Sequence, residues 1–143
     1  MSPTVLVPYD GSEQADRAVD HAIERFSDAD VVLLTVINPA ESVYATGEGA
    51  VSPFPENWYE GAQEQAEHMV EGVLERFEEE GISVKSDIEV GRPGRAIIQY
   101  VDENEVDHIV MGSHGRSGVS RILLGSVAET VMRRSPVPVT VIR

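Results

Sequence analysis

The stretch that decides the fold reads Met111-Gly112-Ser113-His114-Gly115-Arg116-Ser117-Gly118-Val119-Ser120-Arg121-Ile122-Leu123-Leu124-Gly125-Ser126. It follows a short apolar run and precedes a helical pattern over residues 127–134. The stretch is rich in glycine and hydroxyl groups, carries two arginines and lacks carboxylates, although the whole chain is strongly acidic. A flexible, locally cationic loop between a strand and the N-terminus of a helix is suited to cradling phosphate.

Outward from this loop, short apolar runs alternate with helical patterns in both directions. The runs predict five strands, at residues 4–9, 31–37, 82–90, 107–111 and 137–142. Apolar residues at helical spacing predict four helices between them, over residues 15–26, 57–80, 96–101 and 127–134. Residues 40–56 show no period and predict a long surface loop.

This alternation predicts an α/β fold with a doubly wound parallel sheet and helices on both of its faces. The second run is continuously apolar, as expected of a strand that is covered on both sides, whereas residues 82–90 alternate and predict a strand nearer an edge. We find no internal repeat or boundary, so the 143 residues predict a single domain.

Composition narrows the class of protein. The formal net charge is −14, and Lys85 is the only lysine among the 11 basic residues. Such a chain repels phosphates over most of its surface, which argues against general nucleic-acid binding. It has no cysteine, no apolar run of roughly 18 residues and no signal-peptide pattern, so we expect a cytoplasmic protein without a membrane span. This acidic composition is typical of proteins from a cytoplasm kept at high salt. It is equally compatible with an ordinary soluble acidic protein.

Two features follow predicted strands and can meet in such a sheet. Asp10 comes after the first strand, and Gly112 begins the loop after the fourth. Ligands of open α/β sheets bind beyond the carboxyl ends of the strands, where the strand order reverses. There a carboxylate can accept hydrogen bonds from ribose hydroxyls while loop amides bind phosphate. Taken alone, Asp10 fits a helix cap or an Asx turn better than a ligand.

The glycines of the loop have a regular spacing, G-x2-G-x9-G-[S/T], formed by Gly112, Gly115, Gly125 and Ser126. Glycine suits positions where the backbone approaches an anion or takes a positive φ. The pattern resembles that of the nucleotide-binding branch of the universal stress protein family. The opening residues 7–13 and the closing residues 134–142 resemble the family's first and last strands, so the resemblance spans essentially the whole chain.

The resemblance implies a Rossmann-like sheet with strand order 3-2-1-4-5 and an ATP-binding regulatory protein. It implies that Asp10 binds ribose, that the backbone near Val36 lines the adenine pocket, and that the glycine motif and Ser126 hold the triphosphate. It also implies a homodimer formed through the strand from Val137 to Ile142. On charge grounds we add Arg116 and Arg121 as phosphate contacts, and we expect Mg²⁺ or Mn²⁺ to bridge the phosphates.

Other functions stay open at this point. A dimeric interaction protein of the same fold could bind no nucleotide, although the glycine motif argues against it. An adenylyl-transferring enzyme would need groups that activate the α-phosphate and a second substrate site, and neither is visible. The chain lacks G-x4-G-K-[S/T], a G-x-G-x-x-G after its first strand, and G-x-S-x-G. We therefore expect slow ATP hydrolysis at most.

Several polar residues have simpler interpretations. Ser12 fits a helix-capping residue better than a ligand. His114 lies within the loop, where an exposed histidine is the favoured state, although a phosphate contact is the alternative. His21, His68 and His108 are scattered and predict no metal site.

Overall fold

The computed structural model describes residues 2–40, 58–114 and 124–143. Strands and helices alternate through these residues. In chain order they are β1 (Thr4–Pro8), α1 (Glu13–Arg25), β2 (Asp30–Ile37), α3 (Trp58–Glu79), β3 (Val84–Val90), α4 (Pro93–Glu103), β4 (His108–Gly112), α5 (Ser126–Arg134) and β5 (Val139–Ile142). The predicted loop at residues 40–56 falls almost entirely outside the described residues.

The five strands form one parallel sheet in the order β3-β2-β1-β4-β5. This confirms both the predicted fold class and the strand order that the resemblance implied. β1 lies at the centre, where Leu6 pairs with Val32 of β2 and with Ile109 of β4. β3 forms one edge, as its alternating sequence predicted.

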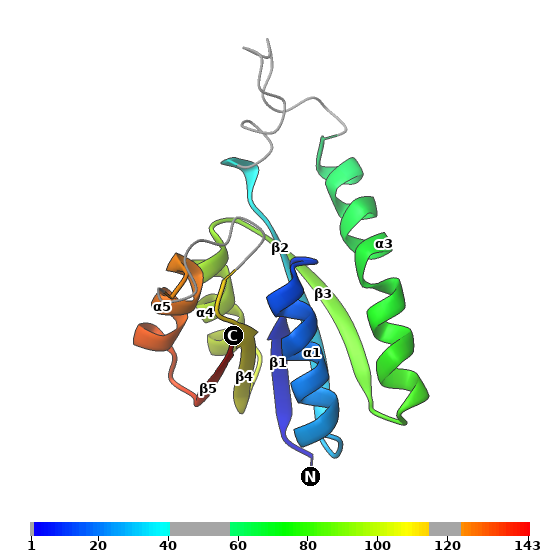
Figure 1. The fold of residues 1–143 in the computed structure, drawn as a ribbon. Helices are drawn as coiled ribbons and strands as arrows, with labels where there is room; N and C mark the ends of the chain where they lie inside the picture. The colour runs from blue at the N-terminus through cyan, green and yellow to red at the C-terminus, as the bar shows by residue number, and fades with distance from the viewer. Residues whose placement is uncertain (1, 41–57, 115–123) are drawn as a thin grey trace.

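Helices cover both faces of the sheet, with α1 and α3 on one side and α4 and α5 on the other (Figure 1). Successive residues of the central strands point to opposite faces, which is why the apolar runs are continuous. Val5, Val7 and Leu33 pack with α1 and α3, whereas Leu6 and Leu34 pack with α4 and α5. The core therefore consists of two apolar layers that share the sheet.

Local sequence explains where elements begin. Ser12 caps α1, because its Oγ accepts a hydrogen bond from the Ala15 amide at 3.1 Å, which confirms its capping role. Pro93 occupies the first turn of α4, where its missing N–H costs nothing. β5 begins at Val139, two residues later than predicted, because Pro138 has no N–H to donate to a ladder.

No described helix is both long enough and apolar enough to cross a bilayer.

Candidate functional site

The carboxyl ends of β1 and β4 lie side by side at the centre of the sheet. The helix after β1 packs on one face and the helix after β4 packs on the other (Figure 1). The strand order thus reverses here, which is where open α/β sheets bind ligands. The predicted meeting of the Asp10 turn with the start of the glycine loop is therefore confirmed. We call the end of the sheet where the strands finish the carboxyl edge, and the opposite end the amino edge.

Hydrogen bonds to β2 and within the turn itself hold the turn after β1. The Tyr9 amide donates to the Leu34 carbonyl at 2.8 Å, and the Thr35 hydroxyl donates to the Tyr9 carbonyl at 3.2 Å. Asp10 Oδ1 accepts from the Ser12 amide at 2.9 Å, so the Asx-turn interpretation is correct. These bonds fix a partly buried carboxylate at the carboxyl edge, and a carboxylate has lone pairs for further donors.

Gly11 completes this turn, and its backbone conformation favours glycine. Its φ is +80°, which disfavours other residues, and a Cβ here would lie 2.9 Å from Met69 Sδ on α3. Helix α3 therefore packs directly against the turn that positions Asp10.

Gly112 and Gly125 allow close backbone contacts. A Cβ on Gly112 would lie 2.7 Å from Gln14 Cβ and 2.8 Å from the Gln14 carbonyl carbon on α1. A Cβ on Gly125 would lie 2.8 Å from the Ser113 carbonyl oxygen, which accepts a hydrogen bond from the Gly125 amide. Neither glycine has a positive φ. The space that a side chain of Gly112 would fill is occupied by α1, and the predicted contact of this residue with phosphate stays a prediction.

Gly125 is the N-cap of α5, and its lack of a side chain leaves the cap without a side-chain hydrogen bond. Exposed Ser126 begins the helix. The first amides of a helix need acceptors from outside it, and the helix dipole favours negative charge at this end. α5 thus directs donors towards the carboxyl edge from the side opposite α1.

Ser113 and His114 connect β4 to the loop. Ser113 is 2% exposed, and its amide donates to the Ile142 carbonyl at 2.7 Å. His114 is partly buried rather than exposed, so the favoured interpretation of this residue was wrong. Its Nδ1 lies 2.9 Å from Ser113 Oγ, and its Nε2 is buried without a hydrogen-bond partner among the described residues.

The remaining predicted residues divide into two groups. Val36 lies near the carboxyl end of β2, partly buried beside the layer formed with α4 and α5. Gly115, Arg116 and Arg121 lie outside the described residues, so their predicted phosphate contacts stay predictions. The structure thus brings Asp10, Val36, Gly112, Gly125 and Ser126 to one edge of the sheet.

Comparison with known proteins identifies the family. The model of the universal stress protein family matches residues 1–143. The chain belongs to the universal stress protein family.

Two proteins resemble this stress protein over nearly the whole of both chains. Universal stress protein MJ0577 of Methanocaldococcus jannaschii is 33% identical, and the match covers 100% of this chain and 96% of the relative. The solved structure of MJ0577 superposes with a TM-score of 0.82 and covers 99% and 96% of the two chains. A universal stress protein solved in complex with cAMP is 27% identical, with a TM-score of 0.67 and coverage of 99% and 96%.

Two arginines at the carboxyl edge of this stress protein were not among the site residues predicted from the sequence. Arg92 and Arg95 are exposed in the first turn of α4, which starts from the carboxyl edge after β3. Neither forms an ion pair within the described parts of the chain. The sequence does indicate a locally cationic segment here, since residues 91–101 contain both arginines and no acidic residue.

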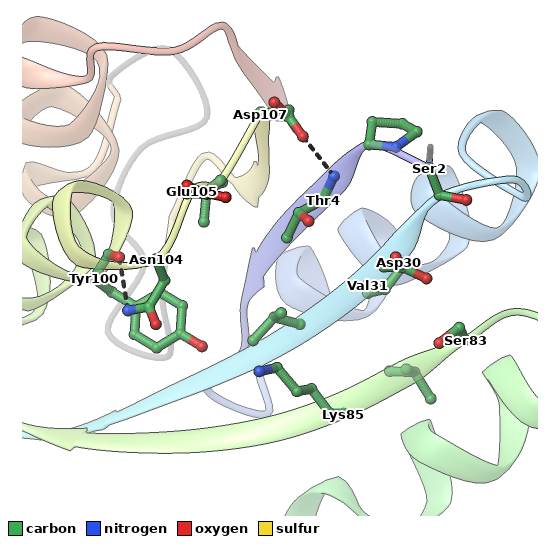
Figure 2. Close-up of a pocket in the computed structure, with 14 residues that line it drawn as sticks. Ser2, Thr4, Asp30, Val31, Ser83, Lys85, Tyr100, Asn104, Glu105 and Asp107 are labelled. Carbon is green, nitrogen blue, oxygen red and sulfur yellow. Dashed lines mark hydrogen bonds between the residues drawn. The ribbon is translucent and has the colours of Figure 1, made fainter.

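A groove of about 1190 Å³ lies at the opposite, amino edge (Figure 2). The end of α4 and the turn after it line one side, and the starts of β1, β2 and β3 line the other. Two hydrogen bonds join residues of its lining to each other. The Thr4 amide donates to Asp107 Oδ2 at 2.8 Å, and Asn104 Nδ2 donates to the Tyr100 carbonyl at 3.0 Å.

The hydroxyl of Tyr100, another lining residue, donates to Oδ2 of Asp87, which lies outside the lining, at 3.0 Å. Burial, with this hydrogen bond and the nearby carboxylate, raises the pKa of Tyr100 to about 12.

Within the described ranges, no three histidine or carboxylate side chains are grouped so as to hold a metal ion.

Proposed function

We propose that this universal stress protein binds an adenine nucleotide at the carboxyl edge, between the Asp10 turn and the N-terminus of α5. The observation that carries the proposal is the placement of these two features on either side of the point where strand order reverses. A carboxylate suits ribose hydroxyls, and helix amides suit phosphate oxygens. The relative solved with cAMP, itself an adenine nucleotide, supports the same ligand class.

In this proposal each residue has a separate part. Asp10 accepts hydrogen bonds from the ribose, and the backbone near Val36 borders the adenine. Gly112 and Gly125 bring β4, α1 and α5 close enough to define the phosphate end, where Ser126 offers an amide and a hydroxyl. Gly115, as part of the glycine motif, and Arg116, on charge grounds, complete the phosphate contacts.

The ligand we propose is ATP with Mg²⁺ or Mn²⁺. Among the described residues no acidic or histidine cluster is suited to hold such a cation. The phosphates themselves would therefore supply most of its ligands, as is common for Mg²⁺. Hydrolysis would be slow at most, and the protein would act as a regulator whose state depends on the bound nucleotide.

The proposal includes a homodimer through the C-terminal strand. β5 is the second edge of the sheet and pairs with β4 on one side. All four of its residues are only partly buried, which leaves an edge able to pair with a second copy. The Ser113 amide also bonds to the carbonyl of Ile142, so a change at the nucleotide site has a direct path to this strand.

Two measurements on the purified protein test the proposal. Small molecules released by denaturation are identified by mass spectrometry, and titration calorimetry then measures binding of ATP, ADP, AMP and adenosine to the ligand-free protein. Both run at low and at molar KCl, with circular dichroism to show that the protein is folded. Light scattering with and without ATP reports the dimer.

We expect binding of an adenine nucleotide in at least one salt condition, with GTP binding more weakly as the control. A folded protein that binds no adenine nucleotide in either condition would overturn the proposal. It would then favour the non-nucleotide-binding interaction protein of the same fold.

A further inference from the structure

Thr35 is the one polar residue in the apolar run of residues 31–37, which forms most of β2. It is 7% exposed, and a buried hydroxyl needs a hydrogen-bond partner inside the protein. Its Oγ1 donates to the Tyr9 carbonyl at 3.2 Å. The hydroxyl therefore acts where β2 meets the turn that carries Asp10.

The hydrogen bonds between β1 and β2 follow a regular spacing. In a parallel pair the bonds are evenly spaced, so each donor lies two residues after the previous donor on its strand. At the start of the pair, the Asp30 amide donates to the Pro3 carbonyl at 2.8 Å. At its end, the Tyr9 amide donates to the Leu34 carbonyl, also at 2.8 Å. The same spacing assigns the Tyr9 carbonyl to the Val36 amide, as the next bond in the series.

This next bond is not formed among the described residues. The paired register of β1 with β2 ends at Pro8, and the Tyr9 carbonyl accepts from the Thr35 hydroxyl instead. The Val36 amide is therefore directed to the β1 side of β2 without the acceptor that a regular sheet would supply. Val36 lies near the carboxyl end of β2 and is only partly buried, so this N–H lies at the carboxyl edge.

A neutral N–H at this edge favours one kind of ligand atom. A backbone amide donates to an uncharged acceptor, such as a ring nitrogen of a heterocyclic base, and so fixes the orientation of a flat ring. The ring nitrogens N1, N3 and N7 of adenine carry no proton and accept such a bond. The carboxyl edge thus offers a base a donor that a regular ladder between β1 and β2 would have used.

We infer that Thr35 is a positioning residue for the base: its hydroxyl occupies the Tyr9 carbonyl and leaves the Val36 amide to donate to a ring nitrogen of adenine. The inference rests on the proposed function and refines it, because it assigns recognition of the base to a donor that a side chain keeps out of the sheet. Removal of the hydroxyl should return this amide to the sheet, since Tyr9 is buried and its carbonyl then needs another donor.

Calorimetry with adenosine and with ATP compares three variants. Thr35→Val keeps the size of the side chain but removes the donor, so both ligands should bind about fivefold more weakly, the effect of roughly one neutral hydrogen bond. Thr35→Ser keeps a hydroxyl and should bind both within about twofold of the wild type. Thr140→Val is the matched control, because it removes a hydroxyl of β5 that lies 2.7 Å from His108 Nε2, and it should leave both affinities unchanged.

Adenosine analogues in which CH replaces one ring nitrogen identify the acceptor. The wild type should bind one of 1-deaza-, 3-deaza- and 7-deazaadenosine about fivefold more weakly than adenosine, and Thr35→Ser should show the same loss. Thr35→Val should bind that analogue as it binds adenosine, because the donor has already returned to the sheet. A general loss of stability would weaken the binding of all these ligands alike, so this comparison separates positioning from folding.

Hydrogen exchange of the Val36 amide, followed by NMR, tests the geometry directly. Without ligand, this amide should exchange about tenfold faster in the wild type than in Thr35→Val, where it bonds to the Tyr9 carbonyl. Bound adenosine should slow the exchange in the wild type, because the base then accepts from the amide.

Failure of the proposed function and failure of this inference give different results. A folded wild type that binds no adenine nucleotide contradicts the proposed function itself. Binding by the wild type with equal affinities in Thr35→Val overturns only the role of Thr35. So does equal binding of adenosine and all its deaza analogues by the wild type, or a Val36 amide that exchanges equally slowly in both ligand-free proteins.

Discussion

The two edges of this sheet are built from the same five strands but have opposite chemistry. At the amino edge, a groove of about 1190 Å³ is lined in part by groups that already have hydrogen-bond partners, as the Thr4 amide has in Asp107 and the Tyr100 hydroxyl has in Asp87. At the carboxyl edge, glycines bring backbones into contact, the cap of α5 has no side-chain bond, and the Nε2 atom of His114 is unpaired among the described residues.

The difference between the two edges shows that the volume of a groove does not determine whether the groups around it can bind a ligand. A group that already has a hydrogen-bond partner gains little from a ligand, because binding must first break that bond. A helix terminus or a buried nitrogen without a partner gains the whole interaction. We therefore expect substitutions at the carboxyl edge to change nucleotide binding or folding strongly, and matched substitutions at the amino edge to change them less.

The largest effect is expected from a methyl group on a glycine of the carboxyl edge. Gly112→Ala places a Cβ 2.7–2.8 Å from Gln14 of α1, including its backbone. The helix must shift, so we expect a loss of about 3 kcal/mol in the free energy of unfolding, the upper part of the range for overpacking. Urea denaturation followed by circular dichroism measures it.

Gly81→Ala is the counterpart at the amino edge. Gly81 has a φ of +72°, but a Cβ there would meet nothing within 4 Å. The cost should be the backbone strain alone, about 1 kcal/mol. Equal losses in the two variants would remove the packing argument for Gly112.

The next effect compares two carboxylates. Asp10→Ala should weaken ATP binding about 30-fold, or close to 2 kcal/mol, because it removes the charged acceptor for the ribose hydroxyls. Asp30→Ala changes the net charge equally at the amino edge, where Asp30 is exposed at the start of β2. Calorimetry should show ATP affinity unchanged in Asp30→Ala within about twofold.

A similar loss in both aspartate variants would mean that overall charge, not the Asp10 turn, governs affinity. Loss of the Asp10 turn could also weaken binding indirectly, since Asp10 bonds to the Ser12 amide. Asp10→Asn keeps an oxygen for that bond, so an intermediate affinity in this variant would separate the turn from the ribose contact.

The fold was predictable because its signals are local. Each apolar run and each helical pattern lies within one element, and their alternation alone restricts the topology to a parallel sheet. The capping role of Ser12 was predictable for the same reason, since its acceptor and donor are three residues apart. Strand boundaries were less exact where proline intervened, as at Pro138.

The candidate site was predictable in position but not in its physical details. That Asp10 and the glycine loop meet follows from topology. That Gly112 serves contact with Gln14 depends on how α1 packs, and the burial of His114 depends on Ser113 being fixed by Ile142, 29 residues further along. Such long-range contacts leave no periodic signal in the sequence. The groove at the amino edge escaped prediction for the same reason.

The smallest expected effect concerns His108, at the amino end of β4. Burial lowers the pKa of His108, and the nearby His21 lowers it further. Phe26 packs against the ring, with centroids 4.9 Å apart, and Thr140 bonds to Nε2. The folded protein therefore prefers neutral His108, whereas the unfolded chain takes up a proton near pH 6.5.

This preference stabilises the protein above pH 6.5 and is lost as the pH falls through the lower pKa of the folded state. The slope for one proton is at most about 1.4 kcal/mol per pH unit. We expect His108→Gln to reduce the loss of stability between pH 7 and pH 5, measured by urea denaturation, and to leave ATP affinity at pH 8 unchanged. The same pH dependence in both proteins would mean that His108 does not resist protonation. A changed ATP affinity would show instead that the two ends of β4 are coupled, which would break the separation between the edges.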